Sequence, residues 1–243
     1  MDRSQVAMIV GAGPGLGCAL AQRFARAEMN VAMAARHADR LETLAIECSG
    51  IGHYGRAYEC DASVESSVDA LFRNVVAELG PPDVVIYNAG DFVEGSILDT
   101  TVEAFESAWR TGCLGGFVVG RAAARAMAQR IDEGGPAGTI LFTGATASLR
   151  GSARFHSFAV AKFGLRALAQ SMARELHPRG IHVAHVIIDG HIRPPEVVEA
   201  VGAAAREDQL DPAAIAEAYF QLWRQPRSAW THELDLRPWV EKF

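Results

Sequence analysis

Four glycines stand at alternate positions near the start of the chain, at Gly11, Gly13, Gly15 and Gly17. They follow a short apolar segment, residues 6–10, and precede apolar residues at helical spacing. A glycine turn between a strand and a helix points backbone N–H groups and the positive end of the helix dipole at a pyrophosphate. This context favours a dinucleotide-binding loop over an ordinary tight turn.

The end of the second predicted strand, residues 31–35, should contact the adenosine ribose of such a cofactor. An acid there would bind the 2′-hydroxyl of NAD, but the chain has Ala34-Ala35-Arg36-His37 and no acid before Asp39. The Arg36 guanidinium could bind a 2′-phosphate, assisted by Arg40. We therefore expect NADP(H) to be favoured over NAD(H), the alternative being that Arg36 is a solvated surface residue.

Short apolar runs alternate with segments of helical spacing along the whole chain. The predicted strands are residues 6–10, 31–35, 55–60, 84–87, 139–143, 181–188 and 231–236. The predicted helices are residues 16–24, 39–48, 63–79, 102–127, 157–176, 194–206 and 212–223. This order is typical of a doubly wound α/β fold, so we expect one Rossmann-type domain over residues 1–243, with helices on both faces of a parallel sheet of about seven strands.

The composition limits the classes of function. The chain has 243 residues, a net charge of −6 and 49% hydrophobic residues, which fits a folded protein and argues against a general binder of nucleic acid or anionic membranes. Its four cysteines are widely separated, so neither a metal site nor a disulfide framework is expected. With no apolar run of membrane-spanning length, we expect a cytoplasmic protein.

Residues 189–209 form the segment in which we expect mobility. The segment is rich in charged residues, proline and alanine, and follows the sixth predicted strand. Sheets of this type often carry a lid over the substrate at this place, so we predict a mobile substrate lid there.

The order of these motifs resembles the short-chain dehydrogenase/reductase family. Gly11-x-x-x-Gly15-x-Gly17 is similar to the cofactor loop of the family, and Tyr87-Asn88-Ala89-Gly90 is similar to the end of its fourth strand. Asp61 matches an acid that contacts adenine, and residues 159–176 match the helix that carries the active-site lysine, here Lys162. The resemblance covers about residues 5–190.

The resemblance implies hydride transfer between a nicotinamide cofactor and a small carbonyl or alcohol, in a homodimer or homotetramer. The substrate itself is not specified. The residues that the resemblance and the loop pattern place at the cofactor are Gly11, Gly13, Gly15, Leu16, Gly17, Arg36, Asp61, Asn88, Ala89, Gly90, Lys162 and Ile192.

The catalytic positions depart from the family pattern. The family carries a tyrosine acid/base four residues before the lysine, where this chain has Phe158. The serine that polarises the substrate aligns with Ala145, and the asparagine of the proton relay aligns with Gly112. Of these four positions only Lys162 keeps the family residue, and none of the four tyrosines has a lysine four residues later.

Other groups near the expected pocket could supply a proton. The candidates are Cys113, Thr146, Ser148, His156, Asp189 and His191. His156 is about 200° from Phe158 around an ideal helix, so it should turn away from the Lys162 face. Cys113 could be a buried small hydrophobe, and Asp189 and His191 suit substrate or lid contacts better than catalysis.

Two hypotheses therefore remain at the level of the sequence. In the first, the chain is a divergent NADP(H)-dependent oxidoreductase with a non-standard site. In the second, it binds a dinucleotide without turnover, as a sensor or as the silent subunit of an assembly. Both hypotheses require the cofactor loop.

Overall fold

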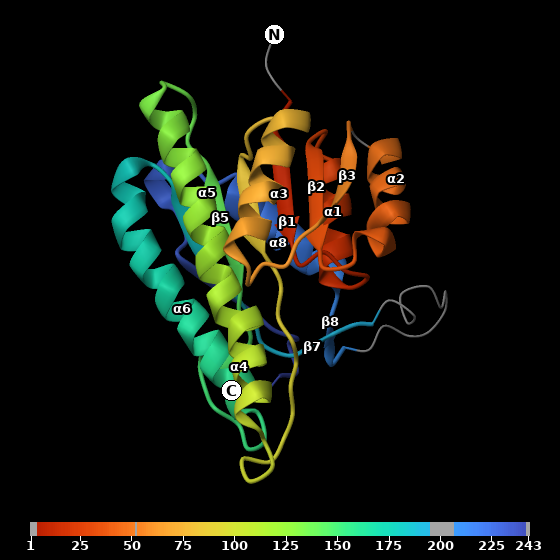
Figure 1. Ribbon diagram of the computed structural model, residues 1–243, viewed down its shortest axis with the longest axis vertical. Coiled ribbons are helices and arrows are strands. Elements are labelled where there is room, and N and C mark those ends of the chain that lie inside the picture. Colours follow the sequence, from red (N-terminus) through yellow and green to blue (C-terminus); the bar gives the residue numbers. More distant parts are fainter. Residues whose placement is uncertain (1–3, 52, 195–206, 242–243) are drawn as a thin grey trace.

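A computed structural model describes residues 4–51, 53–194 and 207–241 of the chain. Its centre is a seven-stranded sheet of parallel strands in the order β3-β2-β1-β4-β5-β6-β9 (Figure 1). The strands are β1 (Val6–Val10), β2 (Asn30–Ala35), β3 (Gly55–Glu59), β4 (Val84–Tyr87), β5 (Thr139–Thr143), β6 (His182–Ile188) and β9 (Glu233–Leu236). The predicted fold class and the seven predicted strands are confirmed.

The strand order reverses between β1 and β4, which is where a doubly wound sheet opens a crevice. In the ladders at this point Val10 lies opposite Ala34 on β2 and opposite Tyr87 on β4. All five residues of β1 are buried, because helices cover both faces of the sheet. The residues that follow β1 and β4 therefore meet at one edge.

Two helical layers sandwich the sheet (Figure 1). One apolar core packs β-strand side chains against α3 (Glu65–Glu78), α5 (Gly115–Asp132) and α6 (His156–Leu176). The other packs them against α1 (Leu16–Ala25), α2 (Glu42–Ile51) and α8 (Pro212–Trp223). The alternation of side chains along each strand divides the core in this way.

The helical region predicted at residues 102–127 is interrupted and extends further. It consists of α4 (Val102–Trp109), a π-helical turn η2 (Arg110–Leu114) and α5, which continues to Asp132. The Tyr87 hydroxyl donates a hydrogen bond to the carbonyl of Thr111 inside the turn. A Cβ at Gly115 would lie 2.3 Å from the same hydroxyl oxygen, so the turn forms where the helix lies directly on β4.

Short elements complete the connections between the strands and helices. They are the 3₁₀ turns η1 (Ala38–Leu41), η3 (Thr146–Ser148), η4 (His177–Arg179) and η5 (Arg227–Ala229) and the two-stranded ladder of β7 (His191–Ile192) with β8 (Gln209–Leu210). The helix predicted at residues 194–206, and with it most of the predicted lid, lies outside the described residues. In the described part of the chain, no helix is both long enough and apolar enough to cross a membrane.

Candidate active site

The glycine turn after β1 fits closely against the end of β4. Gly11 has φ of +92°, and a Cβ there would lie 2.3 Å from the backbone nitrogen of Ala89. A Cβ at Gly17 would lie 2.8 Å from the Cα of Ala12, so both positions require glycine. Gly13 and Gly15 have no atom within 4 Å of such a Cβ, and their half-buried backbone lines a cleft.

This first cleft, of about 320 Å³, is formed by the ends of β1, β2, β3 and β4. The Asn88 side chain lines this cleft and donates a hydrogen bond from Nδ2 to the carbonyl of Gly11 at 3.0 Å. Asp61 accepts hydrogen bonds from the backbone and hydroxyl of Ser63, at 2.9 and 2.8 Å. The predicted cofactor residues that line this cleft are Gly11, Gly13, Gly15, Leu16, Gly17, Arg36, Asp61, Asn88, Ala89 and Gly90.

A pyrophosphate fits this cleft on two grounds. The start of α1 has no side-chain cap and no acidic residue in its first turn, so the positive end of the helix dipole is not neutralised by the protein. The open backbone at Gly13 and Gly15 lets a ligand approach the chain closely. The residues present therefore suit a dinucleotide.

Arg36 lies at the rim of the first cleft, directly after β2. Its side chain is 61% exposed, and Nη2 is 3.6 Å from a carboxylate oxygen of Asp91. A long contact between exposed groups binds weakly and leaves the guanidinium free to turn toward a phosphate. Arg40, by contrast, is exposed and does not line the cleft.

A second cleft of about 600 Å³ adjoins the first and shares Leu16, Asn88 and Gly90 with it. One wall is aromatic: the ring of Phe92 lies 5.0 Å from the ring of Phe155 and 5.3 Å from that of Phe158, measured between centroids. Ala145, Ala147, Ile188 and Ile192 add apolar surface. This cleft suits a substrate with an apolar substituent.

Lys162 lies on the wall of the second cleft, and its side chain is buried. Nζ donates a hydrogen bond to the carbonyl of Thr143 at the end of β5, at 2.8 Å, and lies 5.8 Å from the ring centroid of Phe158. A Cβ at Gly90 would lie 3.1 Å from Nζ, so the glycine lets the β4 loop pass close to the ammonium group. Burial lowers the pKa of Lys162 to about 8.

Two of the three positions that we expect to depart from the family pattern lie at the second cleft. Phe158 and Ala145 both line it, as expected from their spacing to Lys162 and β5. Gly112 does not, because it is buried in the π-helical turn, where a Cβ would lie 2.7 Å from the Cβ of Ala161 on α6. The two helices are too close at this point for an asparagine side chain.

Two predicted hydroxyl donors belong to polar networks. Thr146, at the second cleft, donates to the buried carboxylate of Asp189, which also lies 3.3 Å from Nη2 of Arg237. Ser148 is buried, and its Oγ accepts a hydrogen bond from the backbone of Ala145 at 3.1 Å. Neither Ser148 nor Asp189 lines the cleft.

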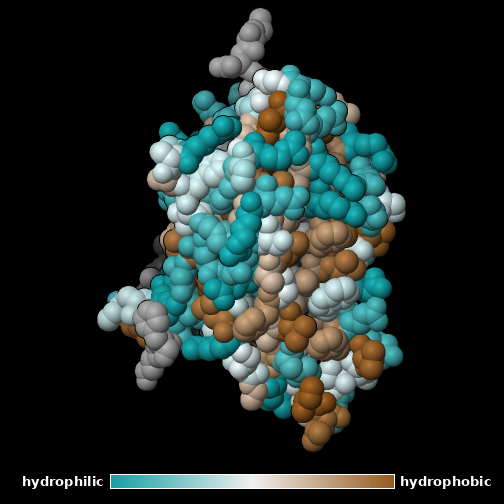
Figure 2. All heavy atoms as spheres, turned by 90° about the vertical axis from the view of Figure 1, so that its left-hand side faces the viewer, coloured by the Kyte–Doolittle hydropathy of each residue, from teal (hydrophilic) through white to brown (hydrophobic). Residues whose placement is uncertain are grey.

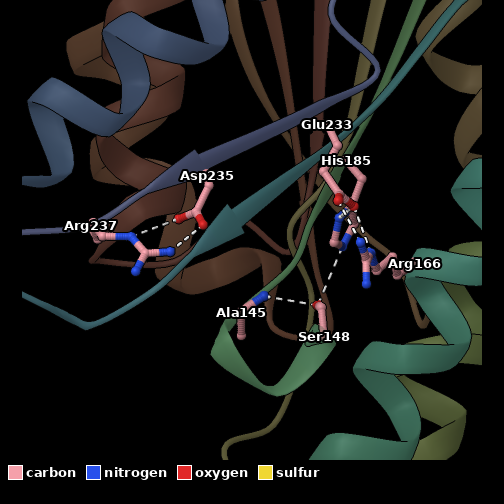
Figure 3. Close-up of polar contacts among 7 residues, drawn as sticks. All are labelled: Ala145, Ser148, Arg166, His185, Glu233, Asp235 and Arg237. Carbon is pink, nitrogen blue, oxygen red and sulfur yellow. Dashed lines mark hydrogen bonds and ion pairs between the residues drawn. The ribbon is translucent and has the colours of Figure 1, made fainter. Parts of the chain in front are cut away.

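The Ser148 network continues across the sheet (Figure 3). Ser148 points from η3 toward His185 on β6, with 3.4 Å between Oγ and Nε2. Glu233 on β9 lies 3.1 Å from Nδ1 of His185 and accepts two hydrogen bonds of 2.7 Å from Arg166. Burial lowers the pKa of His185 to about 4, so a neutral imidazole fixes the end of β5.

Of the remaining candidate proton donors, one lines the second cleft and two do not. His156 begins α6 and does not line the second cleft, in agreement with its predicted orientation. The thiol of Cys113 lies 2.6 Å from where a Cβ on Gly164 would be, and burial raises its pKa. His191 on β7 does line the cleft and is exposed.

Sequence reasoning missed part of the lining. Phe92, Phe155, Arg150, Ser152 and Glu241 line the second cleft, and Thr111 lines the first. The aromatic pattern of residues 92, 155 and 158 becomes visible only when the loop after β4 is placed against the start of α6. The local signal that could have indicated Phe92 is its position, two residues after the motif Tyr87-Asn88-Ala89-Gly90 at the end of β4.

Comparison with known proteins places this architecture in a family. The model of the short chain dehydrogenase family matches residues 5–199. A short-chain dehydrogenase/reductase from Armillaria gallica is 32% identical over 198 residues, which cover 80% of this chain and 74% of the relative. The chain therefore belongs to the short-chain dehydrogenase family, whose members are NAD(P)-dependent oxidoreductases.

Solved structures agree with this assignment. A short-chain dehydrogenase from Rhodopseudomonas palustris is 42% identical and superposes with a TM-score of 0.82. The match covers 98% of this chain and 100% of that chain. An alcohol dehydrogenase from Thermococcus sibiricus, solved with 5-hydroxy-NADP, is 25% identical with a TM-score of 0.84, covering 99% of each chain.

Substitutions in the glycine turn should separate folding from cofactor binding. Gly11→Ala should destabilise the fold by about 2 kcal/mol or more, because it adds a clash at a positive φ. The matched variant Gly13→Ala should unfold close to wild type but bind NADPH more weakly, because its methyl group enters the cleft. Thermal unfolding and NADPH fluorescence titration measure the two effects. Equal destabilisation by both variants would contradict this account of the turn.

Proposed function

We propose that the protein is an NADP(H)-dependent oxidoreductase that reduces a small carbonyl compound, or oxidises the corresponding alcohol, at a site without the usual tyrosine. The observation that carries the proposal is the continuity of the two clefts through Asn88 and Gly90, with Lys162 on the wall of the second. A nicotinamide cofactor bound in the first cleft would supply or accept hydride at this junction.

The residues that line the second cleft can position the substrate and exclude water from it. The aromatic wall and Ile188 offer an apolar surface to the body of the substrate, and Arg150 and His191 offer polar contacts at the cleft. Apolar lining with few polar groups favours aliphatic or aromatic aldehydes and ketones over sugars. Positioning alone can supply a large part of a rate enhancement.

The function is tested by single-turnover oxidation of NADPH, followed by absorbance, with a panel of aldehydes, ketones, enones and sugars. We expect turnover with apolar carbonyl compounds and little with sugars. Saturable NADPH binding without turnover on any compound would contradict the proposal.

The second candidate is a dinucleotide-binding protein without turnover. It is favoured by Phe158, which has no proton to give, and by the contact between position 112 and Ala161, which leaves no room for the relay asparagine. Turnover that is absent in the wild type but appears in the Ala145→Ser, Phe158→Tyr double variant would support this candidate.

Preference for NADP(H) rests on Arg36 at the rim of the first cleft, and the cofactor carried by the Thermococcus sibiricus relative supports it. Arg36→Gln should weaken NADPH binding roughly ten- to a hundredfold, because a charge-assisted contact to a 2′-phosphate is lost, and leave NADH binding unchanged. Arg40→Gln, outside the cleft lining, is the control. Fluorescence titration measures the NADPH and NADH affinities of the wild type and of both variants, and equal losses of NADPH and NADH affinity in Arg36→Gln would refute this role.

A homo-oligomer is also part of the proposal. Apolar side chains gather on the face that bears α5 and α6 (Figure 2), and four of those exposed on α4, α5 and α6 are Val102, Phe117, Val160 and Phe163. Phe163→Glu should dissociate the assembly, whereas Val76→Glu, equally exposed on α3, should not. Sedimentation velocity distinguishes the outcomes, and a wild-type monomer would contradict the proposal.

A further inference from the structure

In the part of the second cleft that the structure describes, few side chains can exchange a proton. Its hydroxyl groups belong to Thr143, Thr146 and Ser152, and that of Thr146 is already directed to Asp189. Hydroxyl groups are weak acids, and an arginine such as Arg150 keeps its proton at any ordinary pH. Among the described residues, the ionisable side chains that remain on the wall are Lys162, His191 and Glu241.

These three side chains differ in how firmly the fold holds them and in where they lie on the wall. His191 is exposed on the two-residue strand β7, and Glu241 follows β9 outside any helix or strand. Lys162 is held on the long helix α6, one turn after Phe158, and its ammonium group is fixed on the end of β5. It is the group that combines a fixed position with a place beside the junction of the two clefts.

The surroundings of Lys162 leave its ammonium group able to donate. The hydrogen bond to the Thr143 carbonyl uses one of three N–H groups, and the described residues place no carboxylate within ion-pair distance of Nζ. The Phe158 ring lies where a tyrosine would present a competing hydroxyl. The lysine therefore keeps two N–H groups that can donate to a substrate at this wall.

We infer that Lys162 is itself the proton donor for carbonyl reduction in this chain, an inference that rests on the proposed function. As hydride reaches the carbonyl carbon, negative charge develops on the carbonyl oxygen. The oxygen then takes a proton from Nζ: an O–H bond forms, an N–H bond breaks, and the electron pair stays on nitrogen. A solvent proton restores the ammonium group, so each turnover consumes one carbonyl, one NADPH and one proton.

The electrostatic surroundings suit this exchange. Burial, without a compensating charge, lowers the pKa of Lys162 to about 8, so the group is charged at neutral pH and can lose its proton. The charged and titratable groups around it are largely engaged elsewhere. Arg166 and His185 pair with Glu233, Asp189 pairs with Arg237, and Tyr219 donates to Thr143. Asp91 makes a long, weak contact of 3.6 Å with Arg36, and Arg150, His191 and Glu241 lie on the cleft wall.

The sequence makes the lysine directly observable, because its lysines are Lys162 and Lys242. In a Lys242→Arg variant grown with ¹³C-labelled lysine, Lys162 gives the one lysine side-chain signal in the NMR spectrum. We expect this signal to titrate near pH 8 rather than near the ordinary value of about 10.4. A midpoint near 10 would overturn the inference, with no need for a substrate.

Single-turnover kinetics test the catalytic step itself. The rate of NADPH oxidation should fall tenfold for each pH unit above the NMR midpoint. Lys162→Arg keeps the positive charge but does not give up a proton at ordinary pH, so it should lower the rate by about 10²–10⁴-fold. In Phe158→Tyr, the pH at which the rate begins to fall should move away from the NMR midpoint. In His191→Gln, this pH should stay where it is in the wild type.

The outcomes distinguish this inference from the function on which it rests. No NADPH oxidation with any carbonyl compound would overturn both. The lysine assignment alone would be overturned if Lys162→Arg kept the wild-type rate. It would also be overturned if His191→Gln abolished the fall in rate at alkaline pH. If Lys162→Arg fails to fold, the NMR midpoint and the wild-type pH profile still decide the question.

Discussion

One hydrogen bond joins the parts of the candidate site: the ammonium group of Lys162 donates to the carbonyl of Thr143. This bond ties α6 to the carboxyl end of β5 from one face of the sheet. From the other face, Tyr219 on α8 donates to the hydroxyl of the same threonine at 2.8 Å. A buried ammonium group is costly unless a polar partner receives it, so the site depends on this strand end being held rigidly. The Ser148, His185 and Glu233 network provides a further anchor just beyond it.

Local patterns allowed much of this arrangement to be predicted from the sequence. The alternate glycines fixed where the chain turns at the first cleft, and the four-residue spacing of Phe158 and Lys162 put both on one helix face, where the structure has them. Long-range contacts could not be predicted. Residues 92 and 155 are distant in sequence, as are His185 and Glu233, and such pairs meet only once the sheet is assembled. The π-helical turn was missed because it arises from packing on Tyr87, which no helical periodicity records.

The residues at the three positions that we expect to depart from the family pattern form a consistent set in space. Glycine at position 112 lets the η2 turn lie so close to α6 that a Cβ there would be 2.7 Å from the Cβ of Ala161, which leaves no room for an asparagine side chain. Phenylalanine at position 158 extends an aromatic wall with Phe92 and Phe155, and alanine at position 145 continues that apolar surface. The cofactor cleft keeps its glycines, Asn88 and the open start of α1. The second cleft is thus largely apolar around the buried ammonium group of Lys162.

The central claim is that hydride transfer persists at a site where position 158 has no proton to give. The most direct measurement uses NADPH deuterated at the transferable C4 position, the wild-type chain and an apolar aldehyde, with mass spectrometry of the alcohol product. The account predicts that deuterium appears at the former carbonyl carbon, in an amount equal to the NADPH oxidised. Bound, unreacted NADPH and unlabelled aldehyde after many hours would contradict it.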